Sequence, residues 1–177
     1  MIAQDLLIQS VTEAAAEVFG TMLEMAVEFT GFATGDTGAE NGLISLIGIT
    51  GDWAGAGVFC CPPELAATIC GRMLGTEVET GGTAVDEEIM DVVAEVANMV
   101  IGNIKNALEP ITGPLAISVP TVIHARNFHF RNTTGREYAN LTFTTEGQTF
   151  QVRLSLAPNM EQAAGHARIP SLGMAHF

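Results

Sequence analysis

The architecture of this chain follows from residues 85–109, VDEEIMDVVAEVANMVIGNIKNALE. Asp86 is a good N-cap for a helix, and Glu87 and Glu88 supply the negative charge that the first turn of a helix favours. Pro110 comes directly after the stretch and is expected to end the helix. The stretch therefore predicts one long helix with well-marked ends.

Two faces are expected on this helix, because each residue turns it by about 100°. Glu95 and Asn98 are three positions apart, so a carboxylate and a carboxamide neighbour each other on one face. The opposite face is apolar and should be buried against the rest of the protein. The apolar face consists of Ile89, Val92, Val93, Val96, Val100 and Ile104, and the polar face of Glu88, Asp91, Glu95, Asn98, Gly102 and Lys105.

Gly102 interrupts the polar face, where a glycine costs about 1 kcal/mol of helix stability relative to alanine. Without a side chain at this position, a partner could approach the helix backbone closely. A solvated helix face that tolerates a glycine explains the same letters. Both interpretations stay open on the helix pattern alone.

The composition is that of one ordinary globular domain. A chain of 177 residues can bury a core without disulfides or metal, and 47% hydrophobic residues argue against general disorder. No apolar run reaches the length of a membrane span. Near the N-terminus Asp5, Glu13 and Glu17 stand where a signal peptide would be apolar, so a cytoplasmic protein is expected. We expect a single domain over residues 1–157 and a weakly ordered C-terminal tail over residues 158–177.

The charge and the cysteines argue against several classes of function. The net charge is −13, which repels nucleic acid and anionic membranes from most of the surface. Cys60, Cys61 and Cys70 form no C-x-x-C pair, and the four histidines lie far from them in the sequence. Buried free thiols are therefore expected, rather than a disulfide or a metal site.

The remaining chain alternates helices with groups of strands. Before residue 85 we expect a helix over 4–26, the start of a strand in 27–33, a glycine-rich acidic loop over 34–42, a hairpin of strands 43–50 and 56–61, and a helix over 63–74 capped by Gly75. After Pro110 we expect strands over 115–125, 127–132, 137–146 and 148–156, with an edge or a break at Pro120 and a tight turn at Glu146–Gly147. This order predicts an α+β fold of two layers, in which long helices pack on one face of a mostly antiparallel β-sheet.

With these positions in view, the stretch DVVAEVANMVIGN (residues 91–103) resembles the chemotaxis phosphatase family typified by CheX, which is related to CheC and the flagellar switch protein FliY. The signature of that family is Asp or Ser, three residues, Glu, two residues, Asn, and a proline some twenty residues later. Asp91, Glu95, Asn98 and Pro120 are its counterparts here. The preceding GITGDWAGAGVFCCPPELAATICGRMLG is similar to the family's strand, strand and helix, so the resemblance covers about residues 43–130 and implies a CheC/CheX-like fold.

Two checks place this resemblance more closely. Glu137 and Asn140 repeat the spacing of Glu95 and Asn98, but in an expected strand, where an odd offset sends side chains to opposite faces. CheC-like members carry a second Glu-Asn pair on the first helix. Here Glu13, Glu17 and Glu24 are followed three positions later by Ala16, Gly20 and Val27, which makes the chain more similar to the single-site CheX type.

The resemblance implies a phosphatase whose substrate is a phosphorylated, CheY-like response regulator receiver. In that role Asn98 would position a water molecule in line with the phosphoaspartate, and Glu95 would anchor to a lysine of the receiver. Asp91 and Gly102 would be contact positions around this insertion. The family needs no cofactor or metal of its own, since Mg²⁺ is held by the receiver, and its precedent implies a possible homodimer through sheet edges.

Two other functions fit the same residues. A non-catalytic docking module of the same fold would bind a receiver or a flagellar component without turnover. A purely structural subunit would show no phosphorylation-dependent binding at all. Nucleic acid and membrane insertion are not expected, because of the negative charge and the lack of a spanning segment.

Overall fold

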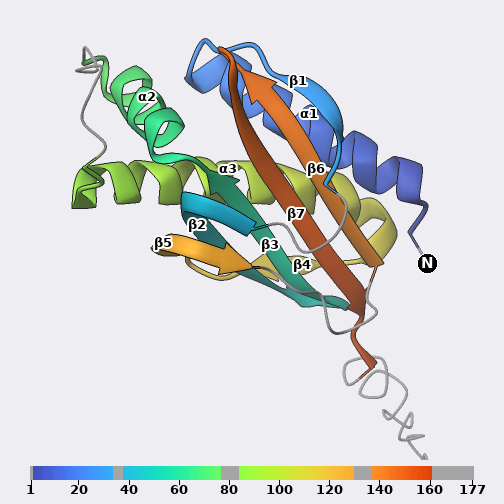
Figure 1. The fold of residues 1–177 in the computed structure, drawn as a ribbon. Coiled ribbons are helices and arrows are strands. Elements are labelled where there is room, and N and C mark those ends of the chain that lie inside the picture. Colours follow the sequence, from blue (N-terminus) through green and yellow to red (C-terminus); the bar gives the residue numbers. More distant parts are fainter. Residues whose placement is uncertain (1, 34–37, 77–83, 130–136, 161–177) are drawn as a thin grey trace, which may run out of the picture.

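The computed structural model describes residues 2–33, 38–76, 84–129 and 137–160 of the chain (Figure 1). Three helices and seven strands lie in these ranges. The helices are α1 (Gln4–Met22), α2 (Pro63–Leu74) and α3 (Glu87–Thr112). The strands are β1 (Glu28–Phe32), β2 (Gly38–Gly51), β3 (Trp53–Cys61), β4 (Leu115–Ile117), β5 (Thr121–His129), β6 (Glu137–Thr145) and β7 (Gln148–Pro158).

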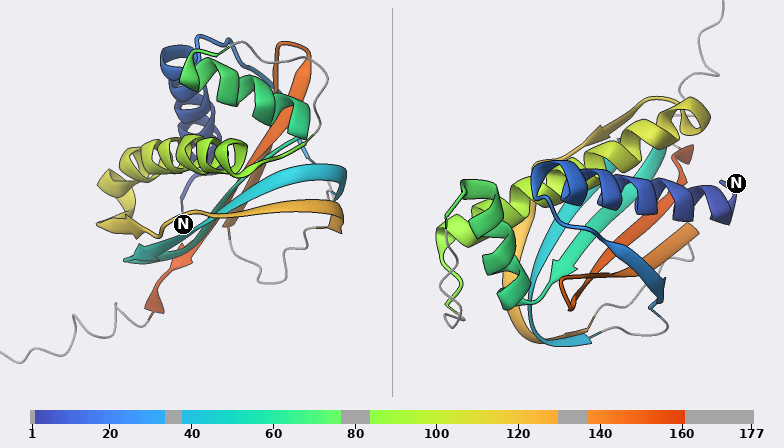
Figure 2. Two further views of the ribbon diagram at one scale, coloured as in Figure 1. Left: turned by 90° about the vertical axis from the view of Figure 1, so that its left-hand side faces the viewer. Right: turned by 90° about the horizontal axis from the view of Figure 1, so that it is seen from above.

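The strands form one sheet in the order β1-β6-β7-β3-β2-β4, with β5 also paired to β2. Every strand pair in the described part of the chain is antiparallel. The long helices α1 and α3 lie on the same face of this sheet (Figure 2). The structure thus confirms the predicted α+β fold, a two-layer arrangement of helices on one face of an antiparallel sheet.

Aromatic rings join α1 to the centre of the sheet. Phe19 of α1 stacks on Phe150 of β7 with ring centroids 4.5 Å apart, and Phe143 of β6 stacks on the same ring at 5.2 Å. Phe59 of β3 lies 5.4 Å from Phe150 in a tilted arrangement. All four rings are almost fully buried, and rings of this size contribute large apolar areas to a core.

Helix α3 crosses the sheet on the apolar face that the sequence predicts. Its N-cap is Asp86, whose Oδ1 accepts a hydrogen bond from the backbone N–H of Ile89 at 2.9 Å. A Cβ atom on Gly57 of β3 would come within 2.5 Å of Ile101, so this glycine lets α3 pack closely on the sheet. The buried residues of the predicted face are Val92, Val93, Val96, Val100 and Ile104, and Ile89 is partly buried.

Two helix ends differ from the prediction. The first helix was expected to reach residue 26 but ends at Met22, because the backbone turns at Glu24, which has a left-handed φ of 54°. Leu23 and Met25 are nevertheless buried, which is why the apolar spacing continued past the helix. Helix α3 continues past Pro110 to Thr112. A proline in the last turn removes only one hydrogen bond there, so it does not end the helix.

The prediction of an acidic loop over residues 34–42 is wrong for its second half. Strand β2 begins at Gly38, and residues 38–42 pair with residues 125–129 of β5. A composition rich in glycine and acidic residues is typical of a loop, and only the pairing with β5 makes this segment a strand. Residues 34–37 lie outside the described part of the chain, as do the predicted link at 77–83, the strand end at 130–132 and the tail from residue 161 on.

Most other predicted elements are confirmed, but the separate strand expected from residue 127 is wrong, because β5 runs without a break from Thr121 to His129. Strand β1, the hairpin of β2 and β3, and helix α2 lie where the sequence places them, and Gly75 caps α2 with a left-handed φ of 65°. Glu146 and Gly147, with φ of 47° and 76°, form the tight turn between β6 and β7. The run 115–125 is broken at residues 118–120 into β4 and β5, as Pro120 predicted.

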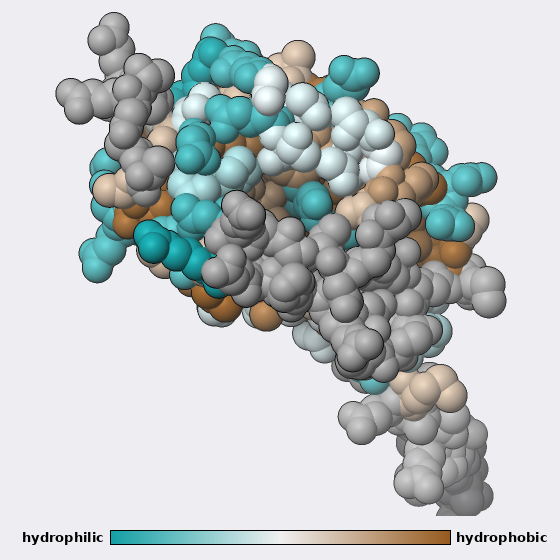
Figure 3. All heavy atoms as spheres, in the orientation of Figure 1, coloured by the Kyte–Doolittle hydropathy of each residue, from teal (hydrophilic) through white to brown (hydrophobic). Residues whose placement is uncertain are grey.

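Hydrophilic residues cover much of the surface on the side seen in Figure 3. In Figure 3 the coloured surface is mostly teal or near white, and brown is confined to separated places. In the described part of the chain, no helix is both long enough and apolar enough to span a membrane.

Candidate active site

Glu95 and Asn98 project from the middle of α3, away from the core. Glu95 is exposed and Asn98 is partly buried, whereas Val96 and Ala97 between them are fully buried. These two buried residues fix the rotation of the helix, so the carboxylate and the carboxamide lie on one outer face. No described residue forms a hydrogen bond with either side chain, so both groups are available to a partner.

Asp91 and Gly102 extend this face by one helical turn on each side. Asp91 is exposed. A Cβ atom on Gly102 would meet only Ile117 Cδ1, at 3.9 Å, so the space into which a side chain would project here is nearly open. The four residues that the sequence singled out therefore form one continuous strip on α3, acidic at its N-terminal end and bare at its C-terminal end.

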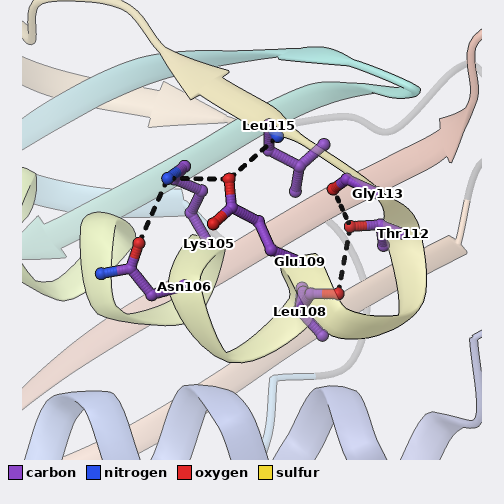
Figure 4. A network of polar contacts seen from close by, with 7 residues as sticks. All are labelled: Lys105, Asn106, Leu108, Glu109, Thr112, Gly113 and Leu115. Carbon is purple, nitrogen blue, oxygen red and sulfur yellow. Dashed lines mark hydrogen bonds and ion pairs between the residues drawn. The ribbon is translucent and has the colours of Figure 1, made fainter.

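Lys105, the only basic residue of α3, is held inside the protein's own network (Figure 4). Its Nζ lies 2.9 Å from Oε1 of Glu109, and the same oxygen accepts the backbone N–H of Leu115 at 3.0 Å. The hydrogen bond from Lys105, together with that from Leu115, lowers the pKa of the Glu109 carboxyl. Thr112 Oγ1 also donates to Leu108 O at 3.1 Å. These contacts fix the turn by which the chain leaves α3 and enters β4.

Asn140 and Asn103 each belong to another pair of an acid and an amide, and neither pair resembles the strip. Asn140, of the repeated Glu-Asn spacing, lies in β6 and is buried. Glu17 of α1 accepts a hydrogen bond from Asn103 Nδ2 of α3 at 3.1 Å, so that amide and carboxylate satisfy each other. Sequence reasoning missed this contact between helices, because no local pattern links residue 17 to residue 103.

The chemistry open to the strip is limited by its groups. An amide such as that of Asn98 takes no proton at neutral pH, but it accepts through its oxygen and donates through its nitrogen. It can therefore orient a water molecule, whereas Glu95 can bind a cation such as a lysine. In the described part of the chain, no group of three or more His, Cys, Asp or Glu residues could hold a metal ion.

Comparison with solved structures shows which known fold this is. The chain matches the chemotaxis protein CheX from Vibrio vulnificus with a TM-score of 0.73 and 21% identity, over 89% of this chain and 100% of that one. It matches CheX in the CheX-CheY-BeF3-Mg²⁺ complex from Borrelia burgdorferi with a TM-score of 0.68 and 20% identity, over 85% and 97% of the two chains. FliY from Thermotoga maritima matches with a TM-score of 0.64 and 17% identity, over 88% and 92%.

Sequence comparison gives the family. A search of curated proteins finds no match to this chain. The family model described as chemotaxis phosphatase CheX matches residues 43–144, which include the whole of α3 and also Pro120. Since this match covers more than half of the chain, and the fold agrees with it, the chain belongs to the CheX family of chemotaxis phosphatases.

Proposed function

We propose that this protein hydrolyses the phosphoaspartate of a CheY-like receiver, with Asn98 and Glu95 entering the receiver's active site. The observation that carries the proposal is the shared outer face of the exposed Glu95 and the partly buried Asn98, both unpartnered among the described residues, on a helix whose other face is buried in the core. A partner can therefore meet them without any rearrangement of this chain. The CheX of Borrelia burgdorferi, with the same fold, forms a complex with CheY, BeF3 and Mg²⁺.

Asn98 would act by positioning water. Its amide oxygen accepts from the water and its NH₂ group donates, which holds the water oxygen in line with the phosphorus. The bond from the water oxygen to phosphorus forms as the bond from phosphorus to the aspartate oxygen breaks. The products are a free carboxylate on the receiver and inorganic phosphate, which carries the oxygen and both protons of the water as H₂PO₄⁻. Mg²⁺ belongs to the receiver in this scheme and stabilises the charge on the phosphoryl group.

Glu95 would anchor the insertion rather than take a proton. Its exposed carboxylate faces no cation in the described part of the chain, so a lysine of the receiver can pair with it. Asp91 adds a second negative charge one turn away, and Gly102 leaves room for the receiver to approach the helix. We assign both as contact positions. A homodimer through the outer strands of the sheet remains a prediction.

The test is the decay of acyl phosphate on purified receivers of the source organism, phosphorylated with acetyl phosphate. The wild-type protein should accelerate decay of at least one receiver. Asn98→Ala should lower kcat by about a hundredfold or more, as removal of a group that acts only in the transition state does. Asn103→Ala is the matched control, because it removes an amide from the same helix outside the strip.

Three results would contradict the proposal in different ways. Acceleration that survives Asn98→Ala would remove the assigned role of this residue. Binding of a receiver that is stabilised in its phosphorylated form by beryllofluoride, with no acceleration by the wild type, would make the protein a docking module. No binding in either state would leave a structural role.

A further inference from the structure

The chain next to the candidate site contains a β-bulge at residues 118–120. Ile117 of β4 pairs with Ile49 of β2, and Thr121 of β5 pairs with Leu46. Residues 118, 119 and 120 therefore lie opposite only residues 47 and 48, which is one residue more than a regular ladder holds. Bulges of this kind bend a strand and redirect its side chains.

Hydrogen bonds hold the bulge in one conformation. Ser118 N donates to Gly48 O at 2.9 Å, and Gly48 N donates to Ser118 Oγ at 2.9 Å. The hydroxyl of Ser118 in turn donates to Val119 O at 2.9 Å. Pro120 has no N–H that would need a partner. The backbone of the bulge is thus ordered before any partner arrives.

The bulge lies beside Asn98 and Glu95 along α3. After α3 the chain turns back and runs underneath this helix (Figure 2, left). Gly102 and Ile117 are neighbours, because a Cβ atom added to Gly102 would lie 3.9 Å from Ile117 Cδ1. From Ile117 to Thr121 the ladder advances three positions, about 10 Å. A helix covers the same distance in six to seven residues, at about 1.5 Å each. Counted back from Gly102 along α3, this reaches about Glu95.

Val119 is left uncovered at the centre of the bulge. Its exposed fraction is 83%, the highest of any large hydrophobic residue in the described part of the chain. This apolar side chain is held in water by a backbone that is already ordered. Because this backbone is already ordered, a partner that covers it loses little conformational entropy. The burial of Val119 by a partner would therefore be favourable.

We propose that Val119 is the apolar contact that selects the receiver, and that the receiver covers it when Glu95 and Asn98 enter the phosphorylated site. This inference rests on the proposed function. Two polar side chains on one helix cannot supply an interface of the usual size, about 800 Å² on each partner. The bulge is the next surface along α3, so a receiver centred on Asn98 also reaches Val119.

The test separates recognition from catalysis. Val119→Asp should raise the KM for the phosphorylated receiver by about tenfold, while kcat at saturating receiver stays within about twofold, because the group that positions water is intact. Val119→Ile should restore the wild-type KM. In the Asn98→Ala background, Val119→Asp should weaken binding of the beryllofluoride-treated receiver by the same factor.

Thr121→Asp is the matched control. It adds the same charge two residues away. Thr121 pairs with Leu46, and Ser45 and Ile47 on either side of Leu46 are buried in the core. Leu46 and Thr121 therefore lie on the face of the sheet opposite to the helices. Its KM should equal that of the wild type. An unchanged KM for Val119→Asp, or an equal rise for both variants, would overturn the inference while leaving the phosphatase intact. A wild type that neither binds nor accelerates would remove the proposed function, and this inference with it.

Discussion

At the scale of single residues, a substitution of Gly102 should change stability and activity in opposite directions. It has a helical backbone, and a Cβ atom there would make one ordinary contact, with Ile117 at 3.9 Å. Gly102→Ala should therefore raise the free energy of unfolding by about 0.5–1 kcal/mol, the usual gain for alanine in a helix. If the receiver must approach this backbone closely, the same change should lower kcat/KM for dephosphorylation.

Urea denaturation and the decay assay measure the two effects on one variant. Gly20→Ala in the last turn of α1 is the control, because a Cβ atom there has nothing within 4 Å. It should not lower stability and should leave dephosphorylation unchanged. A stabilised Gly102→Ala protein with full activity would show that the receiver does not use the bare backbone.

Asp91 allows a second test at this scale. It lies one turn before Glu95, and like charges at this spacing repel each other by a few tenths of a kcal/mol in an isolated helix. Asp91→Asn should slightly stabilise the protein, yet raise the KM for the receiver and weaken its dependence on salt. Asp5→Asn, which removes an exposed carboxylate on α1, should change neither the KM nor its dependence on salt. A KM for Asp91→Asn equal to that of the wild type would exclude a contact at this position.

At the scale of elements, the packing of α3 on β3 depends on Gly57. A Cβ atom there would come within 2.5 Å of Ile101, which is fully buried. Gly57→Ala should lower the free energy of unfolding by about 1–3 kcal/mol, as overpacking of a core does. The double variant with Ile101→Val should recover part of the loss in urea denaturation. Additive effects of the two changes would contradict a direct clash between these positions.

The helices were easier to predict than the strands, for a physical reason. The apolar period of α3 and its N-cap Asp86 are local signals, so its position and its buried face could be read directly from the sequence. Its end was missed because a proline is tolerated in the last turn. Strand residues 38–42 carry loop composition, and only their distant partner β5 makes them a strand. Pro120 indicated a break in this run, but the form of the bulge exists only in the register between β2 and its two neighbours.

At the scale of the whole molecule, the candidate site depends on a core that the sequence predicted well. The apolar stripe of α3 is buried as expected, so the position of its exposed face follows from the buried one. What the sequence left open was whether Glu95 and Asn98 were covered by another element. In the described part of the chain no other element covers them, because α1 packs along a different side of α3, where Glu17 contacts Asn103.

The thiols make the stability of the whole fold sensitive to alkaline pH. Burial raises the pKa of Cys60 from 9.0 to about 11, partly offset by Arg153, and burial also raises the pKa of Cys61 and Cys70. A raised pKa means that the unfolded chain loses these protons first. The stability that the protonated thiols contribute is therefore complete below about pH 9 and is lost as the pH rises above that value.

For Cys60 this loss should extend to about pH 11 and amount to about 1.4 kcal/mol for each pH unit. Urea denaturation of the wild type and of Cys60→Ala across this range measures it. The variant should be less stable at pH 8 because of the cavity, but its stability should decline less steeply above pH 9, since one thiol no longer titrates. The other thiols are present in both proteins, so the difference in slope isolates Cys60. Equal slopes would mean that this thiol is not protected from ionisation by its burial between β2 and β7.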